Sequence, residues 1–543
     1  MPLSFSPDGS ELLVSSDIPG SDQLFLWPGM RQVTFGEEAV SGRFLPDGRI
    51  LVERDSGGNE RTQLYIGDDP LVVDERYKHD TPHAAGRTLA YATNRRNGVD
   101  FDVVARDLES GEERVFEIGG YTSVAAISPN GRRIVADRIG ERSGDNDLFL
   151  CDLDSGEVTH LTPHDEPAEY VTPCFHGDEL LWATNEGRET FAVAGVGSLW
   201  DLTCFAGGAS LLVVANEDGY SRLTIDGVDL PLPGRGVVES PVFSPDGTKL
   251  AFAFSSPTQA KNVYLYENGE LRRVTTLEQP QRLVEPELHR LESFDGESVP
   301  VFLFTPEGAG PFPVLVMVHG GPEAQWVPEW HVNYIPLAQH LVSRGYAVAV
   351  PNVRGSTGYG KRYEHLDDVR LRLDSVRDLA ALHAWLAARP EIDGSRAVVY
   401  GRSYGGYMVL AALAFQPELW AAGIESVGIS SFVTFLENTS PYRRAARERE
   451  YGSLERDREF LVEASPITHV DAMRAPLFIQ HGANDPRVPL SESEEIARVL
   501  RDKGVRCELV VYPDEGHSIA KLSNRIDSFE RAVAFLEEVV PAA

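Results

Sequence analysis

The sequence predicts two domains, a repeated all-β domain followed by an α/β domain with a mostly parallel sheet. Three observations lead to this fold class. The chain has 543 residues, and single hydrophobic cores rarely grow beyond about 250–300 residues. A turn phrase recurs along the first half, and apolar strands alternate with helices in the second half. We therefore expect one domain at residues 1–282 and another at residues 283–543.

The recurring phrase in the first half is an apolar residue followed by Pro-Asp-Gly, or a remnant of it, and then a β-rich run. Proline presets φ at the second position of a turn, and Asp-Gly or Asn-Gly tolerates a positive φ. A period of about 40 residues with several short strands per unit is typical of a propeller blade. A β-sandwich with coincidental turns is the alternative, but seven copies favour a seven-bladed β-propeller. The clear copies start at Phe5, Phe44, Ile127 and Phe243, and the weaker ones at Ala85, Phe175 and Phe205.

The pattern changes near Leu283, where a predicted hairpin at 290–304 opens the second domain. Apolar strands that alternate with helices indicate a mostly parallel sheet covered on both faces. The expected strands are 314–318, 347–350, 397–400, 476–482 and 507–512, and the expected helices are 334–344, 374–388 and 404–415.

A serine stands in a glycine-rich turn of this second domain. The strand Ala397–Tyr400 runs directly into Gly401-Arg402-Ser403-Tyr404-Gly405, and a helical pattern follows. This is the context of a nucleophile elbow, in which the flanking glycines let strand and helix approach a strained serine. A GxSxG run alone occurs by chance. Its position between a buried strand and a helix makes Ser403 a candidate nucleophile.

A serine hydroxyl needs a base that a third group holds in place. In this fold type the acid follows the serine and the histidine comes last. Asp485 and His517 each follow a predicted strand, where side chains of open α/β sheets meet. We therefore expect Asp485 to orient His517, and His517 to act as general base. Three rivals are nearby: we expect Asp514 and Glu515 to form the turn, and His481 to be a structural loop histidine.

A second glycine motif follows the predicted strand 314–318. In Val318-His319-Gly320-Gly321-Pro322, the absence of a Cβ leaves backbone N–H groups open to the site. An oxyanion hole in this fold takes one N–H from such a loop and one from the residue after the nucleophile. We assign these donors to Gly321 and Tyr404. A plain Gly-Gly turn is the alternative.

Composition excludes several classes of function. The formal charge is −33, from 50 basic and 83 acidic residues, and such a surface repels phosphate backbones, so we expect no nucleic-acid partner. There is no apolar run of about 18 residues that could span a membrane. The first residues have neither the basic nor the apolar region of a signal peptide. We therefore expect a cytoplasmic enzyme without a membrane partner.

The four cysteines, Cys151, Cys174, Cys204 and Cys507, form no CxxC pair. This pattern supports neither a zinc site nor a redox motif. We expect them to be buried small hydrophobic residues in a reducing compartment, and we expect no metal site.

Four motifs of the second domain occur together: HGGP at 319–322, PNVRGSTGYG at 351–360, GRSYGGYM at 401–408 and NDPRVP at 484–489. Their combination resembles the prolyl oligopeptidase family of serine peptidases, in particular its acylaminoacyl-peptidase-like branch. The resemblance implies a seven-bladed β-propeller followed by an α/β-hydrolase, with Ser403, Asp485 and His517 as the triad.

The same resemblance implies residues that bind substrate. Arg487 is expected to reach the carbonyl of the P2 residue, and Ile429 and Phe432 are expected to line an apolar S1 pocket. The alternatives are a loop salt bridge for Arg487 and ordinary core positions for the other two. Related dipeptidyl peptidases hold the substrate's amino group with a propeller Glu-Glu pair, for which Glu37-Glu38 is a candidate, although exposed acidic pairs are usually only solvated.

The sequence therefore predicts a serine peptidase that acts on short peptides and needs no cofactor. Release of an N-acylated terminal residue is the first expectation, and an unblocked aminopeptidase or oligopeptidase is the second. A carboxylesterase is a further alternative, since the same acyl-transfer groups cleave esters. The propeller is expected to restrict access to the site, and the resemblance implies a homo-oligomer.

Overall fold

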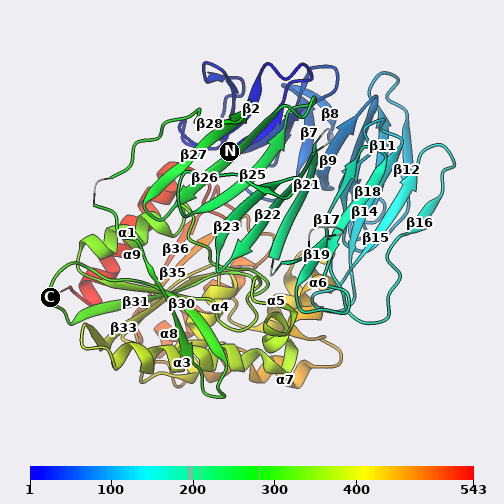
Figure 1. Cartoon of the computed structure of the whole chain (residues 1–543). Coiled ribbons are helices and arrows are strands. Elements are labelled where there is room, and N and C mark those ends of the chain that lie inside the picture. Colours follow the sequence, from blue (N-terminus) through cyan, green and yellow to red (C-terminus); the bar gives the residue numbers. More distant parts are fainter. Residues whose placement is uncertain (194–196, 200, 208–209, 281, 543) are drawn as a thin grey trace.

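The computed structural model describes residues 1–193, 197–199, 201–207, 210–280 and 282–542. A propeller of β-sheets and an α/β domain lie side by side, with the propeller along one side of the α/β domain (Figure 1). Both predicted fold types are confirmed. The prediction of a seven-bladed propeller is confirmed as well, because the described residues form seven four-stranded sheets outside the α/β domain.

Each blade is one contiguous segment whose four strands pair in chain order. The first four blades contain β1 (Pro2–Phe5), β2 (Leu12–Ser16), β3 (Gln23–Trp27) and β4 (Arg31–Gln32); β5 (Val40–Phe44), β6 (Ile50–Arg54), β7 (Gln63–Ile66) and β8 (Asp69–Val72); β9 (His79–Ala85), β10 (Thr88–Thr93), β11 (Asp102–Asp107) and β12 (Glu113–Phe116); and β13 (Thr122–Ile127), β14 (Arg133–Ile139), β15 (Asn146–Asp152) and β16 (Val158–His160).

The last three blades repeat this arrangement. They contain β17 (Tyr170–His176), β18 (Glu179–Thr184), β19 (Phe191–Val193) and β20 (Gly197–Leu199); β21 (Asp201–Gly207), β22 (Ser210–Glu217), β23 (Tyr220–Ile225) and β24 (Val228–Asp229); and β25 (Val237–Phe243), β26 (Lys249–Ser256), β27 (Gln259–Glu267) and β28 (Glu270–Arg273).

The recurring phrase is the turn between the first and second strand of each blade. Gly9 has φ +69° and donates its N–H to the carbonyl of Ser6 at 2.8 Å, and Gly247 repeats this toward Ser244 with φ +71° and 2.8 Å. These are positions where a positive φ is required, which explains the glycine of the phrase. The weak copy that starts at Phe205 runs into residue 208, which lies outside the described residues.

The ring closes by packing between the seventh and the first blade. Apolar side chains of both blades form one buried cluster, which includes Phe5 and Val14 from the first blade and Ala251 and Val263 from the seventh. Lys249 Nζ also donates to the carbonyl of Gly9 at 2.7 Å. The closure therefore rests on side chains between two complete sheets.

The α/β domain is built on one eight-stranded sheet with the order β29-β30-β32-β31-β33-β34-β35-β36. The first two strands form the predicted hairpin, and the strands from β32 onward pair in parallel. The strands are β29 (Glu287–Glu292), β30 (Ser298–Phe304), β31 (Phe312–Val318), β32 (Ala347–Pro351), β33 (Ile392–Arg402), β34 (Ala422–Ser426), β35 (Leu477–Gly482) and β36 (Cys507–Tyr512).

Helices cover both faces of this sheet, as the alternating pattern predicts. Along β31, Val314 and Val316 pack in the core that includes residues of α3, α4 and α8, whereas Leu315 and Met317 pack in the core with α1 and α9. The helices are α1 (Ile335–Ser343), α2 (Lys361–Glu364), α3 (Arg372–Ala387), α4 (Tyr404–Phe415), α5 (Phe432–Asn438), α6 (Pro441–Tyr451), α7 (Arg458–Glu463), α8 (Leu490–Asp502) and α9 (Leu522–Val539).

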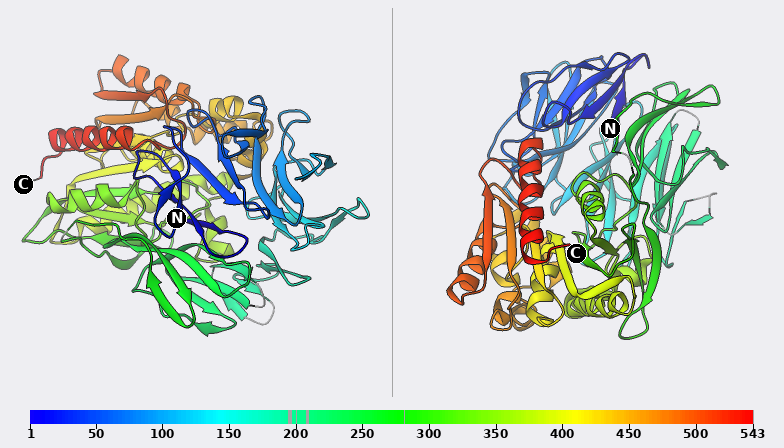
Figure 2. Two further views of the ribbon diagram at one scale, coloured as in Figure 1. Left: turned by 90° about the horizontal axis from the view of Figure 1, so that it is seen from above. Right: turned by 90° about the vertical axis from the view of Figure 1, so that its left-hand side faces the viewer.

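Polar contacts join the two domains around the edge where the parallel strands end. Arg525, near the start of α9, pairs with Asp17 of the first blade at 2.6 Å, and Figure 2 shows α9 in red beside this blade in dark blue. On the other side, Ser143 of the fourth blade donates a hydrogen bond to Glu323 at 2.8 Å. The propeller therefore reaches the segment that follows the HGGP motif.

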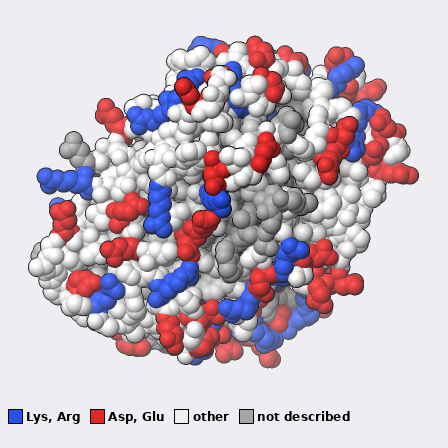
Figure 3. All heavy atoms as spheres, in the orientation of Figure 1, with Lys and Arg blue, Asp and Glu red and all other residues white. Residues whose placement is uncertain are grey.

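Two further expectations concern the membrane and the cysteines. None of the helices in the described part of the chain is long and apolar enough to cross a membrane. Cys151 and Cys507 are buried as predicted, Cys174 is only half-buried, and the side chain of Cys204 lies outside the described residues. Acidic and basic side chains are interspersed over the face drawn in Figure 3, so on this face the charge is not gathered in one patch.

Candidate active site

Ser403 occupies a strained turn between β33 and α4. Its φ of +59° and ψ of −120° place it outside the regions that L-residues favour, and its N–H donates to the carbonyl of Ser426 at 2.9 Å. The glycines on either side are required by space. A Cβ on Gly401 would lie 2.2 Å from the carbonyl oxygen of Gly405, and a Cβ on Gly405 would lie 2.2 Å from that of Val318. The turn therefore has the geometry expected of a nucleophile elbow.

The structure brings Ser403, His517 and Asp485 together in one hydrogen-bonded row. His517 Nε2 lies 3.0 Å from Ser403 Oγ, and His517 Nδ1 lies 2.7 Å from Asp485 Oδ2. Asp485 follows β35 and His517 follows β36, so two neighbouring parallel strands deliver them to one edge of the sheet. This geometry allows proton transfer from the serine to the imidazole.

Burial sets the protonation states of this row. It lowers the pKa of His517 to about 4, although the nearby carboxylate of Asp485 opposes this shift. Burial would raise the pKa of Asp485, but the charge and hydrogen bond of His517 hold that pKa below its usual value. Asp485 Oδ1 also accepts the backbone N–H groups of Arg487 at 2.8 Å and Val488 at 3.1 Å. At neutral pH the imidazole is therefore a neutral base beside an ionised carboxylate.

The three rival residues have other partners. His481 is buried, with Nδ1 2.7 Å from Ser493 Oγ and Nε2 3.0 Å from the carbonyl of Val488. Asp514 pairs with Lys521 at 2.8 Å, and the carboxylate of Glu515 accepts the backbone N–H of Lys521 at 3.0 Å. These contacts fit a structural histidine and two residues that build the turn before α9.

Arg402, inside the GxSxG run, takes part in the site although the sequence analysis assigned it no role. Its guanidinium donates to the carbonyl of His517 and, at 2.8 Å, to Ser518 Oγ. It thus ties the loop that carries His517 to the turn that carries Ser403. No signal in the sequence distinguishes this arginine, because the position between the glycine and the serine accepts many residues.

The HGGP loop lies directly against Ser403. A Cβ on Gly320 would lie 3.3 Å from Ser403 Cβ, and Gly321, with φ +140°, lines the same cavity as Ser403. In the described part of the chain, no backbone acceptor takes the N–H of Gly321 or of Tyr404. Two N–H donors without a backbone acceptor among the described residues, next to Ser403, fit the expected oxyanion hole.

The cavity at Ser403 has a volume of about 140 Å³. Ile429 lines it, as expected, but Phe432 does not. The ring of Phe432 is buried behind the wall between Tyr407 and Tyr451, at centroid distances of 4.6 and 4.8 Å. Phe435, about one helical turn along α5, lines the cavity in its place. The lining residues are Gly321, Glu323, Ser403, Ile429, Phe435, Arg443, Arg447, Tyr451, Arg487 and Val488.

Arg487 lines this cavity and also forms an ion pair with the propeller. Its Nε donates to Glu60 Oε1 at 2.5 Å, while Glu60 Oε2 lies 3.3 Å from Nη1 of Arg443 on α6. Both sequence-based interpretations of Arg487 thus have a structural counterpart, the position at the site and the salt bridge. Glu60 is not among the residues predicted from the sequence, because its loop between β6 and β7 has no distinctive pattern.

A second cavity, of about 360 Å³, lies between the propeller and the loop of His517. It is strongly acidic, and Glu37 and Glu38 both line it, so the predicted acidic pair lies near the site. His517 and Ser518 form part of its wall, and Arg54 and Lys521 are its basic residues. Its eight carboxylates are Asp22, Glu37, Glu38, Glu53, Asp55, Glu60, Asp514 and Glu515.

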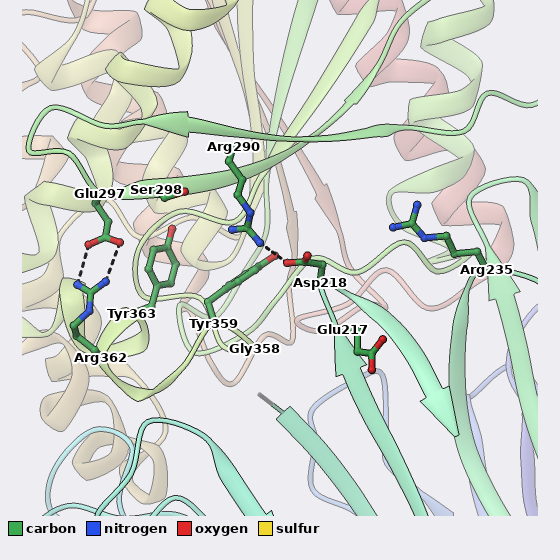
Figure 4. Close-up of a pocket in the computed structure, with 10 residues that line it drawn as sticks. All are labelled: Glu217, Asp218, Arg235, Arg290, Glu297, Ser298, Gly358, Tyr359, Arg362 and Tyr363. Atoms are coloured by element: carbon green, nitrogen blue, oxygen red, sulfur yellow. Dashed lines mark hydrogen bonds and ion pairs between the residues drawn. The ribbon is translucent and has the colours of Figure 1, made fainter. Parts of the chain in front are cut away.

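A larger cavity, of about 780 Å³, lies elsewhere, between the sixth blade and the segment 351–363 (Figure 4). Two of its arginines are paired within it, Arg290 with Asp218 and Arg362 with Glu297 (Figure 4). It contains none of the three residues of the Ser403 row. We therefore do not regard it as the reaction site.

One group of carboxylates in the described part of the chain could hold a cation, namely Asp367, Asp368 and Glu450, of which Asp367 and Glu450 are buried and Asp368 is half-buried. The guanidinium of Arg372, fully buried, pairs with both Asp367 and Glu450. Asp367 also accepts a hydrogen bond from the hydroxyl of Tyr404 at 3.1 Å. The group thus has its own cation and supports the elbow from below, so we assign no metal to it.

A β-propeller joined to an α/β-hydrolase with a Ser-His-Asp row defines a class of serine hydrolases. Residues 331–542 match the model of the prolyl oligopeptidase family. The chain is 32% identical to dipeptidyl aminopeptidase BIII of Pseudoxanthomonas mexicana, over 96% of this chain and 84% of that enzyme. The chain belongs to the prolyl oligopeptidase family and is a serine peptidase.

Two further comparisons are weaker. The human acylamino-acid-releasing enzyme is 26% identical over 41% of this chain and 31% of its own. A solved puromycin-hydrolyzing peptidase of Mycobacterium tuberculosis superposes with a TM-score of 0.82 at 20% identity, over 99% of this chain and 94% of the other. The latter similarity supports the fold.

Proposed function

We propose that this protein is a serine peptidase that releases short N-terminal units, dipeptides foremost, from peptides with a free amino group. Ser403 is the nucleophile, His517 the general base and acid, and Asp485 the residue that orients His517. Gly321 and Tyr404 supply the oxyanion hole. The domain boundary falls between residues 282 and 283, and the propeller restricts access to short peptides.

The reaction proceeds through an acyl-enzyme. His517 Nε2 takes the proton of Ser403 as the oxygen attacks the scissile carbonyl, and the negative charge that develops on the carbonyl oxygen is stabilised by the two N–H groups. The peptide C–N bond breaks as the imidazolium gives its proton to the leaving amine. A water molecule then loses a proton to His517 and attacks the ester, which releases the acyl product and restores Ser403.

The acidic cavity beside His517 carries the proposal for the free amino group. Burial raises the pKa of Asp55, and the nearby charges of Glu38 and Glu60 contribute to that shift. Three carboxylates held so close repel one another, and an ammonium group placed among them relieves this repulsion. Glu60 lies nearest to the substrate path, because it pairs with Arg487, which lines the Ser403 cavity.

This arrangement favours a free amino terminus over an acylated one. A neutral acyl group carries no charge that could offset the repulsion among these carboxylates, whereas an ammonium group does. The relative named a dipeptidyl aminopeptidase matches nearly the whole chain, including the propeller that supplies Glu60. The acylamino-acid-releasing relative matches less than half of it. We therefore place the release of N-acylated residues second.

A substrate panel tests the proposal. Dipeptidyl 4-nitroanilides with a free amine, their N-acetylated forms, single amino-acid anilides and a short ester are compared by kcat/KM. We expect the free dipeptidyl substrates to exceed their acetylated forms by about tenfold or more, since a charge-assisted contact contributes about 1.5–3 kcal/mol. Higher activity on the acetylated series would reverse the order of the two functions. Activity on the ester alone would replace both with an esterase.

A further inference from the structure

We infer that Arg447 makes the cavity beside Ser403 a subsite for an acidic side chain, so that the enzyme prefers glutamate as the residue whose carbonyl is attacked. This inference deepens the proposed function and rests on it for the roles of Ser403 and His517. The family resemblance implied an apolar S1 pocket. The three arginines in the cavity wall favour an acidic side chain at this position.

Three residues of α6 at four-residue spacing line the cavity, namely Arg443, Arg447 and Tyr451. Residues four apart lie on one face of a helix, about 6 Å from one another along its axis. At one end of this row, the hydroxyl of Tyr451 lies 3.4 Å from the carbonyl of Gly321, in the proposed oxyanion loop. At the other end, Arg443 contacts Glu60. Arg447 lies between them.

Arg447 is the cation of this row that has no partner among the described residues. Arg443 pairs with Glu60, and Arg449 on the neighbouring face pairs with Glu323 at 3.3 Å. Arg447 is half-buried and, within the described part of the chain, has no ion pair or hydrogen bond. A guanidinium that is partly removed from water without a partner is available to an anionic ligand.

The cavity is locally cationic in a strongly acidic protein. Three arginines and one glutamate line it, whereas the whole chain carries a formal charge of −33. Burial lowers the pKa of Arg443, the charge of Arg487 lowers it further, and the charge of Arg447 makes a smaller contribution in the same direction. Two neighbouring cations in one wall repel each other, and a carboxylate in the cavity removes that repulsion.

The position of Arg447 assigns it to the acyl side of the substrate. The proposed amino anchor, Glu60, pairs with Arg487 where the two cavities meet, and the scissile carbonyl lies at Ser403. Arg447 lies on the wall between the proposed oxyanion loop and the Arg443–Glu60 contact. A dipeptide unit with its amino group at Glu60 and its second carbonyl at Ser403 therefore places its second side chain toward Arg447.

The rest of the lining fits a glutamate side chain. Ile429, Phe435 and Val488 are buried apolar residues of the same wall. They can pack against the methylene groups while the carboxylate meets the guanidinium. Glutamate and glutamine have nearly the same shape, so the difference between them reports the charge contact alone.

The experiment compares four free-amine substrates, Ala-Glu, Ala-Gln, Ala-Met and Ala-Lys 4-nitroanilide, with the wild-type enzyme and two matched variants. Arg447→Met removes the proposed contact, and Arg444→Met removes an exposed arginine of the same helix that pairs with Glu448 at 3.4 Å. We expect the wild type to cleave Ala-Glu about tenfold or more faster than Ala-Gln in kcat/KM, as for a desolvated charge contact. Arg447→Met should bring this ratio near one, and Arg444→Met should leave it unchanged.

A charge reversal sharpens the test. Arg447→Glu should shift the preference toward Ala-Lys, and Arg447→Lys should keep part of the preference for Ala-Glu. Labelling of Ser403 by a fluorophosphonate reports whether each variant retains a competent site. An equal loss of activity on all four substrates in labelled Arg447→Met would assign this residue to the substrate backbone or to the fold, and would overturn the inference. A wild-type ratio of Glu to Gln near one would do the same.

The same ratio measured on N-acetyl-Ala-Glu and N-acetyl-Ala-Gln anilides separates this inference from the proposed function. If the acetylated substrates are the better ones but glutamate still exceeds glutamine, the free-amine proposal fails and the Arg447 subsite stands. If the free-amine substrates are better and the two ratios are near one, the subsite fails and the proposed function stands.

Discussion

Two cavities of opposite charge meet at the Ser403–His517 pair, and they have different origins. The cavity at Ser403 is lined only by residues of the hydrolase, and three of them are arginines. The cavity at His517 takes six of its eight carboxylates from the first two blades of the propeller. The ion pair between Arg487 and Glu60 lies where the two cavities meet.

This difference separates the groups that we propose carry out the reaction from the groups that we propose select the substrate's end. The Ser403 row, the oxyanion loop and the elbow are held by backbone geometry inside the hydrolase, so we expect the chemistry to depend on the hydrolase alone. The propeller contributes acidic side chains to the cavity at His517 and forms part of its wall. We expect its residues to change which peptides are cleaved more than whether any are cleaved.

The largest effect should come from Ser403→Ala. Without the hydroxyl no acyl-enzyme forms, so kcat should fall by about 10⁴-fold or more. Because alanine fits the elbow with little change of volume, the denaturation midpoint should stay close to that of the wild type. Cleavage of a dipeptidyl anilide and thermal unfolding, measured on the same preparation, check both expectations. Retained cleavage would contradict the whole mechanism.

A stability change should follow from Arg372→Met. Arg372 is fully buried and pairs with Asp367 and Glu450, which lie below the elbow. Removing it leaves two buried carboxylates without their cation, at a cost of about 3–5 kcal/mol in the free energy of unfolding. Denaturant unfolding measures this loss.

Arg370→Met is the matched control for this stability change. Arg370 is largely exposed and pairs with Asp457 at 3.1 Å. Its removal should change the free energy of unfolding by no more than about 1 kcal/mol. Equal effects of the two substitutions would show that the buried cluster contributes little.

A selective effect should come from Glu60→Gln, which changes a propeller residue. We expect kcat/KM on free-amine substrates to fall about tenfold to a hundredfold, the effect of losing a charge-assisted contact. N-acetylated substrates should be cleaved as before, because they place no ammonium near Glu60. Glu37→Gln and Glu38→Gln are the matched comparisons from the same cavity. A larger loss in either variant would indicate that the Glu37-Glu38 pair, and not Glu60, binds the amino group of the substrate.

The sequence predicted the hydrolase in detail because its signals are local. A Cβ at position 401 or 405 would lie 2.2 Å from a backbone oxygen. Both positions therefore require glycine, and this turn shows in the sequence as the pattern GxSxG. The order of serine, acid and histidine follows from the sheet, whose strands carry Asp485 and His517 to one edge. In the propeller, the turn glycines with positive φ recur for the same local reason.

The substrate-binding residues could not be predicted in this way. Glu60 and Arg487 are 427 residues apart and meet only because the two domains dock. Phe432 was expected in the cavity from the family resemblance, but Phe435, about one turn further along α5, lines it instead. Arg447 carries no motif, and its interest comes from the absence of a partner among the described residues, which only a structure shows.

The pH dependence of kcat/KM should further distinguish the base His517 of the hydrolase from the amino-group recognition that we assign to the propeller. His517 must be neutral to take the proton of Ser403, and burial lowers its pKa from 6.5 to about 4. The acid limb of kcat/KM should therefore lie near pH 4 rather than 6.5. Free-amine substrates should also lose activity above about pH 8, where an α-amino group loses its charge. Acetylated substrates should lack this second limb. An acid limb near pH 6.5 would contradict the burial of His517.

The smallest expected effect tests how far the propeller influences the chemistry itself. Ser143 Oγ of the fourth blade lies 2.8 Å from a carboxylate oxygen of Glu323 and 2.8 Å from one of Glu450, so its single proton can serve either of them, and Glu323 directly follows the proposed oxyanion loop. Removing the hydroxyl in Ser143→Ala leaves these carboxylates one hydrogen bond short, which costs about 1 kcal/mol. We expect a loss of about two- to fivefold in kcat on free-amine and acetylated substrates alike, since the loop serves both. Ser155→Ala, at an exposed turn of the same blade, is the control. A loss confined to free-amine substrates would place Ser143 with the selecting residues, and a loss of a hundredfold would mean that the oxyanion loop depends on the propeller.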